Sequence, residues 1–198
     1  MLDTILAFDH SVIFAIQNHL IASWLTPIMY GISKITESGA LWILIAIILM
    51  LTKKYRTIGA GMFLALVFVF IIGDQGLKPH VARLRPFVDF PNVPLQATPP
   101  AATSYSFPSG HSFGSFSASM ALFIGLSAKF PKKAKWGVIA LIFSCIVAFS
   151  RVYLFVHYPT DVLAGFIMGI IVGFFAWCIA LHVSKINSFN WFLKNKTK

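Results

Sequence analysis

The sequence predicts an all-α membrane protein, a polytopic bundle of five transmembrane helices with an interfacial helix before it. Hydrophobic residues make up 58% of the 198 residues and charged residues only 11%, against roughly 25% charged residues in a soluble domain. The mean hydropathy is +0.80. A soluble fold of this size cannot hide so many apolar side chains from water, so the solvent of this chain is a bilayer.

The apolar residues are gathered into runs that match the length of a membrane span, roughly 20 residues. The run that starts near residue 38 is the shortest, but it is uninterrupted from Ala40 to Leu51. The predicted spans, in chain order, are 38–52, 57–77, 110–128, 134–151 and 159–183.

The segment before these spans mixes apolar and polar residues. Residues 4–22 carry Asp9 and Gln17 among isoleucines and phenylalanines, a pattern typical of an amphipathic helix that lies in the membrane interface. Pro27 interrupts the next stretch, and a sixth span through 12–33 stays open. The chain is therefore divided into an interfacial region at 1–36, a membrane domain at 37–185 and a basic cytoplasmic tail at 186–198.

The basic residues orient the bundle. The formal net charge is +10, and eleven of the sixteen Lys and Arg residues follow the first, third and fifth spans, which places those ends in the cytoplasm. A nucleic-acid partner is not expected, because the basic runs are short and no reader motif accompanies them. The predicted location is the plasma membrane. The basic residues on the extracytoplasmic side are Lys34, Lys78, Arg83, Arg85 and Arg151.

Small residues predict close helix contacts. Gly165, Gly169 and Gly173 recur every four residues in the fifth span, and Gly110 and Gly114 do so in the third. Such faces allow membrane helices to approach closely. The two cysteines, Cys145 and Cys178, lie inside apolar runs and form neither a disulfide framework nor a zinc pattern. The proline-rich loop 87–107 is either a lid, a rim near the lipid or a plain linker.

Three motifs fall at one predicted membrane face. The first has the pattern K-x6-RP and runs from Lys78 to Pro86. The second is PSGH, which ends at His111, where the third span begins. The third has the pattern SR-x5-H-x3-D, from Ser150 to Asp161, and joins the fourth and fifth spans.

The residue types in these motifs suit a phosphoryl group, whose transfer spreads negative charge over three oxygens. Arg85 and Arg151 offer bidentate forks to such oxygens, and Lys78 adds a compact charge. Ser109 and Gly110 stand at a helix N-terminus, where free N–H groups attract anions. These five residues are the predicted phosphate-binding set.

Together the three motifs resemble the signature of the type 2 phosphatidic acid phosphatase family, also called lipid phosphate phosphatases. Every fixed position is matched in order, and the resemblance covers about residues 38–183. The family shares its core with vanadium haloperoxidases. The resemblance implies that His157 is the nucleophile, that Asp161 orients it and that His111 is the general acid. Spacing alone shows only a pair of histidines.

The resemblance implies a metal-independent phosphatase that forms a phosphohistidine. No metal or cofactor is expected, because the six acidic residues form no close-spaced cluster. The expected partners are a lipid phosphate or diphosphate and the membrane lipids, with undecaprenyl diphosphate preferred. Phosphatidylglycerophosphate and phosphatidate are the alternatives. The alternative from another class is a non-catalytic protein that binds or transports phosphate lipids.

Two charged residues near the first motif have no firm role in the sequence. Arg83 is interpreted as a headgroup contact. Asp74 is either a polar residue at a helix end or the partner of a motif cation.

Overall fold

The chain folds entirely into helices and connecting loops in the part that the structure describes. The computed structural model describes the backbone of residues 2–196 and the side chains of residues 3–186, so the side chains of most of the predicted basic tail lie outside the described residues. The elements are α1 (Leu2–His19), α2 (Thr26–Ile35), the 3-10 turn η1 (Glu37–Gly39), α3 (Ala40–Leu51), α4 (Arg56–Val69), the π-helical η2 (Phe70–Leu77), α5 (Lys78–Val81), α6 (Pro86–Asp89), α7 (Gly110–Lys129), the 3-10 turn η3 (Pro131–Lys133), α8 (Ala134–Tyr153) and α9 (Pro159–Lys196).

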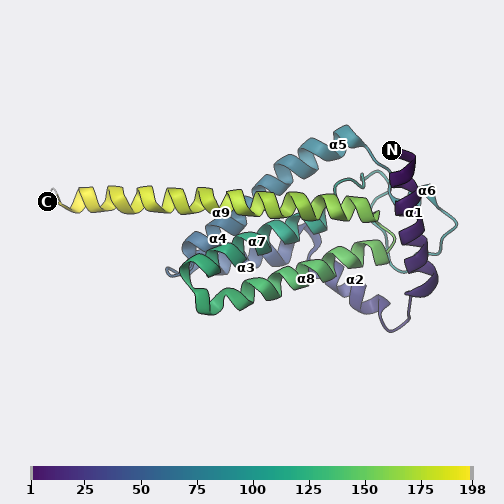
Figure 1. Ribbon diagram of the computed structural model, residues 1–198, viewed down its shortest axis with the longest axis horizontal. Coiled ribbons are helices and arrows are strands. Elements are labelled where there is room, and N and C mark those ends of the chain that lie inside the picture. The colour runs from purple at the N-terminus through teal and green to yellow at the C-terminus, as the bar shows by residue number, and fades with distance from the viewer. Residues whose placement is uncertain (1, 197–198) are drawn as a thin grey trace.

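Helix α7 forms the centre of the bundle. It packs against α3, α4, α8 and α9, which run alongside it in Figure 1. Its serines are buried by these neighbours: Ser119 accepts a hydrogen bond from Ser144 of α8 at 3.0 Å, and Ser112 donates to the carbonyl of Val162 at 2.8 Å. Neighbouring helices thus satisfy these two hydroxyl groups, which is how polar side chains are accommodated in helical membrane bundles.

Three helical segments are long and apolar enough to cross a membrane: Arg56–Asp89, Pro131–Tyr153 and Pro159–Ile186. A fourth is added when Thr26–Ile35 and Glu37–Leu51, which are bent by 41°, are counted as one span. The five predicted spans are therefore matched only in part. Helix α7 falls outside this set because serines and glycines lower its hydropathy. Helix α3 has 12 residues, about 18 Å, and is one arm of the bent pair.

The bend between α2 and α3 has a local cause. Ser38 has φ 52° and Gly39 has φ 73°, so two successive residues adopt the left-handed region. Glycine enters that region at no steric cost because it lacks a Cβ. The turn redirects the chain beside His111 and thereby brings the end of α2 to the motif end of the bundle.

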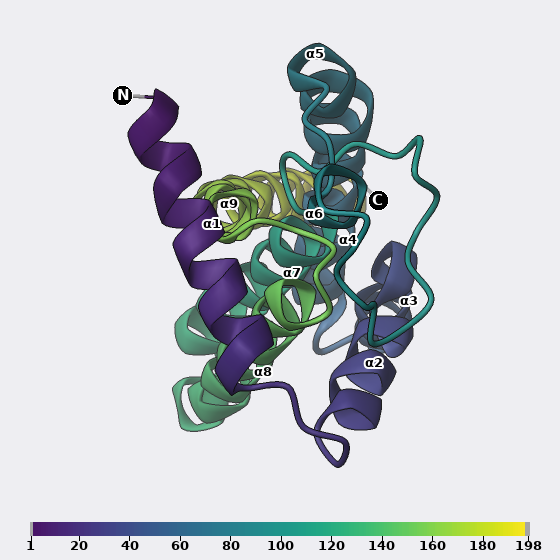
Figure 2. The ribbon, with the colours of Figure 1, turned by 90° about the vertical axis from the view of Figure 1, so that its right-hand side faces the viewer.

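Helix α1 lies across the motif end of the bundle, at a steep angle to α8 and α9 (Figures 1 and 2). Its apolar side includes Ile13 and Ile16, which are buried in a cluster with Tyr153 and Phe155. Gln17 donates to the carbonyl of Tyr153 at 3.0 Å. The amphipathic helix predicted at 4–22 is thus present, and its inner face is firmly packed.

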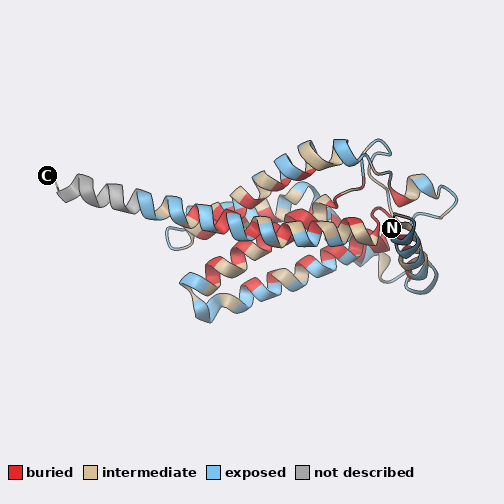
Figure 3. Cartoon of the chain, turned by 45° about the horizontal axis from the view of Figure 1, so that its top comes forward, coloured by how far each residue is buried: buried red, intermediate tan, exposed pale blue. Residues whose placement is uncertain are grey.

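The bundle is apolar on its outside as well as its inside. Exposed residues follow the outer faces of the long helices in Figure 3, and these include Ile71, Ile142 and Phe175, which are 53%, 57% and 56% exposed. Large apolar side chains at that exposure are lipid-facing in a membrane protein. The buried positions concentrate on the faces that the helices turn toward one another.

Glycines let α9 approach α7. A Cβ on Gly169 would lie 2.6 Å from the Cβ of Phe116, and one on Gly173 would lie 2.4 Å from the carbonyl oxygen of Ser117. The small-residue contact predicted for the fifth span is therefore confirmed. The third span takes part in this contact through Ser112 and Ser117 and not through Gly114, where a Cβ would meet only Leu66 at 3.8 Å. Gly114 lines a cavity instead of a helix contact.

The basic turns meet at the end opposite the motifs. Lys133 donates to the hydroxyl of Tyr55 at 2.5 Å, and Lys54 lies 5.1 Å from the ring centre of Phe130. The connection between α3 and α4 is thus joined to the connection between α7 and α8 (Figure 1). Positive charge gathers at this end, as the sequence predicts.

Candidate active site

The three motifs converge at one end of the bundle. Arg85 stands between α5 and α6, and His111 lies in the first turn of α7. Arg151 is in the last turn of α8, His157 lies in the turn between α8 and α9, and Asp161 is in the first turn of α9. These predicted site residues therefore lie at helix ends or in the short connections next to them.

His157 presents one ring nitrogen to the phosphate-binding residues. Its Nε2 lies 3.0 Å from Nη1 of Arg85. An arginine has no acceptor atom, so Nη1 donates and Nε2 carries the free lone pair. The proton of the neutral ring therefore sits on Nδ1. The side chain is 2% exposed, which holds the ring in this orientation.

Ser106 connects His157 to Asp161. Nδ1 of His157 lies 3.3 Å from the Ser106 hydroxyl, and that hydroxyl donates to Oδ2 of Asp161. Nδ1 and Oδ2 of Asp161 are 3.7 Å apart, an ion-pair distance but too long for a hydrogen bond. Asp161, to which the resemblance assigns the orientation of His157, thus reaches the ring through the Ser106 hydroxyl. The sequence contains no signal that marks Ser106, which lies in the loop 87–107.

Local helix geometry aims Asp161 back at His157. Pro159 begins α9, a position that suits proline because its missing N–H is not needed there. Asp161, two residues later, accepts a hydrogen bond from the N–H of Tyr158 at 2.8 Å. This is the return contact of a capping box, and it explains why a spacing of four brings this carboxylate beside the histidine.

The surroundings keep His157 uncharged. Burial lowers the pKa of His157 well below its usual value, and the positive charges of Arg85, Arg151 and Lys78 lower it further. A histidine in this state has a free lone pair near neutral pH. A neutral histidine is the form that a nucleophile requires.

Two arginines form the floor of the site. Arg85 is 5% exposed and is held by the carbonyl oxygens of Val156 and Ser104, each at 2.8 Å. Arg151 is 6% exposed, and its Nη1 donates to the hydroxyl of Ser33. Both guanidinium groups are fixed in place before any ligand binds, which favours an anion of matching shape.

Two buried polar atoms at this floor have no hydrogen-bond partner among the described residues: Nε of Arg151 and the hydroxyl of Ser109. Orphaned buried donors are rare and costly. Ser109 precedes the first residue of α7, where backbone N–H groups are also free. Arg151 and Gly110 line the polar cavity, so an anion there would give a partner to Nε of Arg151 and to the free N–H groups of the first turn of α7.

Lys78 reaches the same place from another element. Its Nζ would lie 3.5 Å from a Cβ on Gly110, so the ammonium group sits directly over the glycine of the PSGH motif. Asp74 holds the lysine at 2.5 Å, which answers the question that the sequence left open. Asp74 belongs to η2, and a π-helical insertion of this kind is frequently found at functional sites.

His111 faces the site from α7. Its Nε2 donates to the carbonyl oxygen of Ser33 at 3.2 Å, and the residue lines the same cavity as His157. Ser33 thus contacts both His111 and Arg151. It comes from α2, in the region 1–36 to which the sequence assigns no site residue.

Arg83 is not a headgroup contact. Its Nη1 donates to Oδ1 of Asp161 at 2.7 Å, and its Nη2 donates to Oδ2 of Asp9 at 2.6 Å. Asp9 is fully buried although it lies in α1. The interpretation from sequence is therefore wrong for Arg83, because a residue far away in the chain supplies its second partner.

Two cavities adjoin at the site. The first, of about 340 Å³, is polar and contains His157, Arg85, Arg151 and Lys78 in its lining. The second, of about 490 Å³, is mainly apolar and lies between α3, α4 and α7. Both are lined by Ser38, Asp74, Gly110 and His111.

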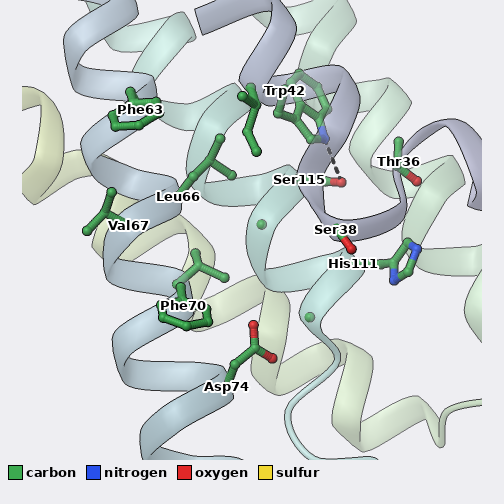
Figure 4. A pocket seen from close by; sticks show the side chains of 15 residues that line it. Thr36, Ser38, Trp42, Phe63, Leu66, Val67, Phe70, Asp74, His111 and Ser115 are labelled. Carbon is green, nitrogen blue, oxygen red and sulfur yellow. Dashed lines mark hydrogen bonds between the residues drawn. The ribbon is translucent and has the colours of Figure 1, made fainter. Parts of the chain in front are cut away.

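Figure 4 shows the apolar cavity in detail. Phe63, Leu66 and Phe70 line it on one side, and Trp42 lies on the other, with its indole N–H donating to Ser115 at 2.9 Å. Asp74 and His111 stand at the end where the polar cavity begins. Among the described residues, no group of three His, Cys, Asp or Glu side chains is arranged to hold a metal ion.

This fold and this site define a membrane lipid phosphatase with an anion-binding centre between helix ends. A model of the PAP2 superfamily matches residues 54–184, and the chain belongs to that superfamily.

Two curated relatives support the assignment. The undecaprenyl-diphosphatase of Sulfolobus acidocaldarius is 31% identical over 163 residues, which cover 82% of this chain and 74% of that protein. Phosphatidylglycerophosphatase B of Bacillus subtilis is 37% identical over 156 residues, which cover 76% of this chain and 73% of that protein.

Solved structures show the same fold. The crystal structure of a transmembrane PAP2 type phosphatidylglycerolphosphate phosphatase from Bacillus subtilis matches with a TM-score of 0.72 and 26% identity, covering 91% of this chain and 88% of that one. The structure of Aquifex aeolicus LpxE matches with a TM-score of 0.64 and 22% identity, covering 84% and 92%, a likeness of fold alone.

Proposed function

We propose that this protein hydrolyses a lipid diphosphate at the outer face of the plasma membrane, with undecaprenyl diphosphate as the preferred substrate. The observation that carries the proposal is the junction of the two cavities. A phosphate held by the cationic floor leaves its lipid chain beside His111 and Gly110, where the apolar cavity begins. A soluble phosphate ester has no use for that second cavity.

The chemistry proceeds through His157. Its Nε2 lone pair attacks phosphorus, a P–N bond forms, and the bond from phosphorus to the leaving oxygen breaks. His111 gives a proton to the leaving oxygen. Water then attacks the phosphohistidine with His111 as the base, which releases inorganic phosphate and restores the free histidine. No step requires a metal ion or cofactor.

The cationic groups stabilise charge during both steps. Arg85, Arg151 and Lys78 surround the equatorial oxygens, and Ser109 with the Gly110 N–H completes the cradle. Asp161, acting through Ser106, balances the charge that develops on the imidazole of His157. When phosphate binds, Nη1 of Arg85 exchanges its hydrogen bond with Nε2 of His157 for one with a phosphate oxygen, which releases the lone pair for attack.

The diphosphate is favoured by one further cation. Lys34 also lines the polar cavity, but it does not belong to the floor formed by Arg85 and Arg151. Its ammonium group pairs with Glu37 at 3.0 Å. A second phosphate offers Lys34 a stronger partner than this exposed carboxylate. Phosphatidylglycerophosphate, the substrate named for the Bacillus relatives, is the second candidate, because the apolar cavity suits acyl chains equally well.

The membrane orientation is inferred from the same geometry. We infer that α7 crosses the bilayer at the centre of the bundle, as one of five spans, and that the basic turns face the cytoplasm. The site then opens outward, and α1 lies at the outer interface. That placement suits a carrier lipid released on the outer surface.

The test is phosphate release by the purified protein in detergent with excess chelator. Undecaprenyl diphosphate, phosphatidylglycerophosphate and phosphatidate are compared, with His157→Ala as the inactive control. We expect chelator-resistant release that is fastest with the diphosphate, and a Lys34→Ala variant whose KM rises for the diphosphate alone. Faster release from phosphatidylglycerophosphate would favour the second candidate. Binding of all three lipids without release would point to the non-catalytic binding or transport protein.

A further inference from the structure

Two residues outside the motifs connect helix α1 to the catalytic carboxylate. Asp9 is fully buried, although it belongs to a helix that crosses the end of the bundle. Arg83 occupies a variable position of the first motif, and its side chain is 18% exposed. Neither residue contacts the phosphate-binding floor in the described contacts, so the mechanism above does not use them.

Arg83 divides its charge between two carboxylates. Its Nη1 donates to Oδ1 of Asp161 at 2.7 Å and to the hydroxyl of Thr160 at 2.8 Å, and its Nη2 donates to Oδ2 of Asp9 at 2.6 Å. The guanidinium carbon lies 4.1 Å from the ring centre of Tyr158. The fork is therefore held on one face by an aromatic ring and at both ends by negative charge.

Asp9 also holds the first turn of α9. Its Oδ1 accepts from the N–H of Thr160 at 2.9 Å, and its Oδ2 accepts from the Thr160 hydroxyl at 2.5 Å. A carboxylate at a helix N-terminus satisfies a free N–H and opposes the helix dipole. The residue after Thr160 is Asp161, so this contact fixes the backbone from which the catalytic carboxylate projects.

We propose that Asp9 and Arg83 are positioning residues for Asp161. Arg83 occupies Oδ1 of that carboxylate and leaves Oδ2 to face Ser106 and His157. Asp9 keeps Arg83 and Thr160 in the geometry that makes this division possible. The inference rests on the proposed role of His157 and Asp161, and it extends the active site to the N-terminal helix.

A purely structural link between α1 and α9 would look different. An apolar contact joins two helix ends without burying charge, and buried ion pairs are often no more stabilising than well-packed apolar groups. Here two buried carboxylates, Asp9 and Asp161, are joined by the partly buried guanidinium of Arg83, which contacts one oxygen of each. The arrangement specifies where a charge sits, which is what charge development on His157 requires.

The test compares Asp9→Asn with Asp3→Asn. The control removes an exposed carboxylate from the same helix. We expect Asp9→Asn to lower kcat about tenfold, the lower end of the roughly 10- to 100-fold loss seen when the residues that orient metal ligands are removed. KM and the inhibition constant of inorganic phosphate should change by less than about twofold. Asp3→Asn should leave all three values unchanged.

Arg83 supplies the second comparison. Arg83→Gln should lower kcat more than Asp9→Asn, because it removes the direct contact with Asp161. Arg83→Lys should recover part of that loss, since it restores the charge without the fork. The double variant Asp9→Asn with Arg83→Gln removes the buried charges together, so it keeps the helix link in neutral form and guards against a folding defect in the single variants.

Three outcomes would overturn the positioning role of Asp9 and Arg83. A kcat of Asp9→Asn equal to that of Asp3→Asn overturns the inference, as does an unchanged kcat with a raised KM and a lowered melting temperature. A double variant with the parent kcat also overturns it. Activity remaining in His157→Ala would instead refute the proposed mechanism, independently of Asp9 and Arg83.

Discussion

Replacing Gly165 by alanine should slow catalysis by shifting the phosphate cradle. A Cβ at this position would lie 2.9 Å from the carbonyl oxygen of Ser109 and 3.0 Å from the amide nitrogen of Phe113. Both atoms belong to backbone, so no side-chain rotation relieves the contact. Ser109 is also the residue that precedes α7, and its buried hydroxyl has no hydrogen-bond partner among the described residues.

The size of the effect can be worked from the distance. Ordinary contact begins at 3.4 Å, so α7 and α9 must separate by about 0.5 Å at Ser109, which is the tolerance within which a catalytic constellation works. A misplacement of about 1 Å can cost about 100-fold in rate. We therefore expect kcat to fall about tenfold in Gly165→Ala, with a stability loss of about 1–3 kcal/mol from overpacking.

Two other glycines calibrate the measurement. A Cβ on Gly173 would meet the carbonyl oxygen of Ser117 at 2.4 Å, a harder clash two turns further from the site. Gly173→Ala should thus lower the melting temperature more than Gly165→Ala does, with a smaller loss of kcat. Nothing lies within 4 Å of a Cβ on Gly31, so Gly31→Ala should leave rate and stability at or slightly above the parent values.

The assay is steady-state phosphate release in detergent, beside thermal unfolding of the same samples. A Gly165→Ala variant that keeps the kcat of Gly31→Ala would refute this reasoning. So would a loss of kcat across the three variants that simply tracks the loss of melting temperature. In either case the contact between α7 and α9 would not control the cradle.

Four further outcomes are expected. Burial and neighbouring cations lower the pKa of His157, so this histidine stays neutral in the folded protein while it is protonated in the unfolded chain below its usual pKa of about 6.5. The free energy of unfolding should therefore fall as the pH falls below about 6.5. The melting temperature of His157→Asn should fall less between pH 7 and pH 5 than that of the parent. Ser106→Ala removes the hydroxyl between His157 and Asp161 and should lower kcat about tenfold while KM stays constant. A tenfold rise in KM beside the loss of kcat would contradict this role. Leu66→Trp narrows the apolar cavity and should raise KM for long-chain lipids while a short-chain phosphate is hydrolysed as before. In a cysteine-free background, Ala101→Cys should react with an impermeant thiol reagent in intact cells and Lys132→Cys should not, and the reverse labelling would place the site in the cytoplasm.

The motif residues of the site could be predicted from the sequence because each stands at or next to a helix end. The topology placed the ends that carry Arg85, His111 and His157 on one side, and the structure brings them into one cavity. The spacing of four between His157 and Asp161 also indicated the right neighbourhood. It could not show that a serine stands between them, because Ser106 lies in a loop without periodicity.

Asp9 and Ser33, which hold the motif residues in place, could not be predicted from the sequence. Asp9 contacts Thr160, which is 151 positions away in the chain, and no local pattern reports such a contact. Asp9 is the one acidic residue of the amphipathic segment 4–22, and an acidic residue there was equally compatible with the membrane interface. Ser33 gave no signal at all, since the bend at Ser38 and Gly39 that turns α2 toward the site depends on two backbone angles.

The number of spans was predictable only in part. Apolar runs identify helices that face lipid, and α8 and α9 were found in this way. Helix α7 faces other helices, and its buried serines, including Ser115, Ser117 and Ser119, lower its hydropathy. Length and composition therefore describe the outer helices of the bundle better than the central one.

The composition of α7 has a consequence for how the protein is made. A helix rich in serine and glycine gains little free energy from transfer into lipid. Inside a bilayer its hydroxyl groups need hydrogen-bond partners such as Trp42 and Ser144. The span proposed for α7 would therefore depend for its stable insertion on neighbours on both sides in the chain, including α8 and α9, which are synthesised after it. Ser109 and His111 stand at the N-terminal end of α7. The active site would therefore assemble only late in synthesis, when α8 and α9 have been made and α7 is inserted.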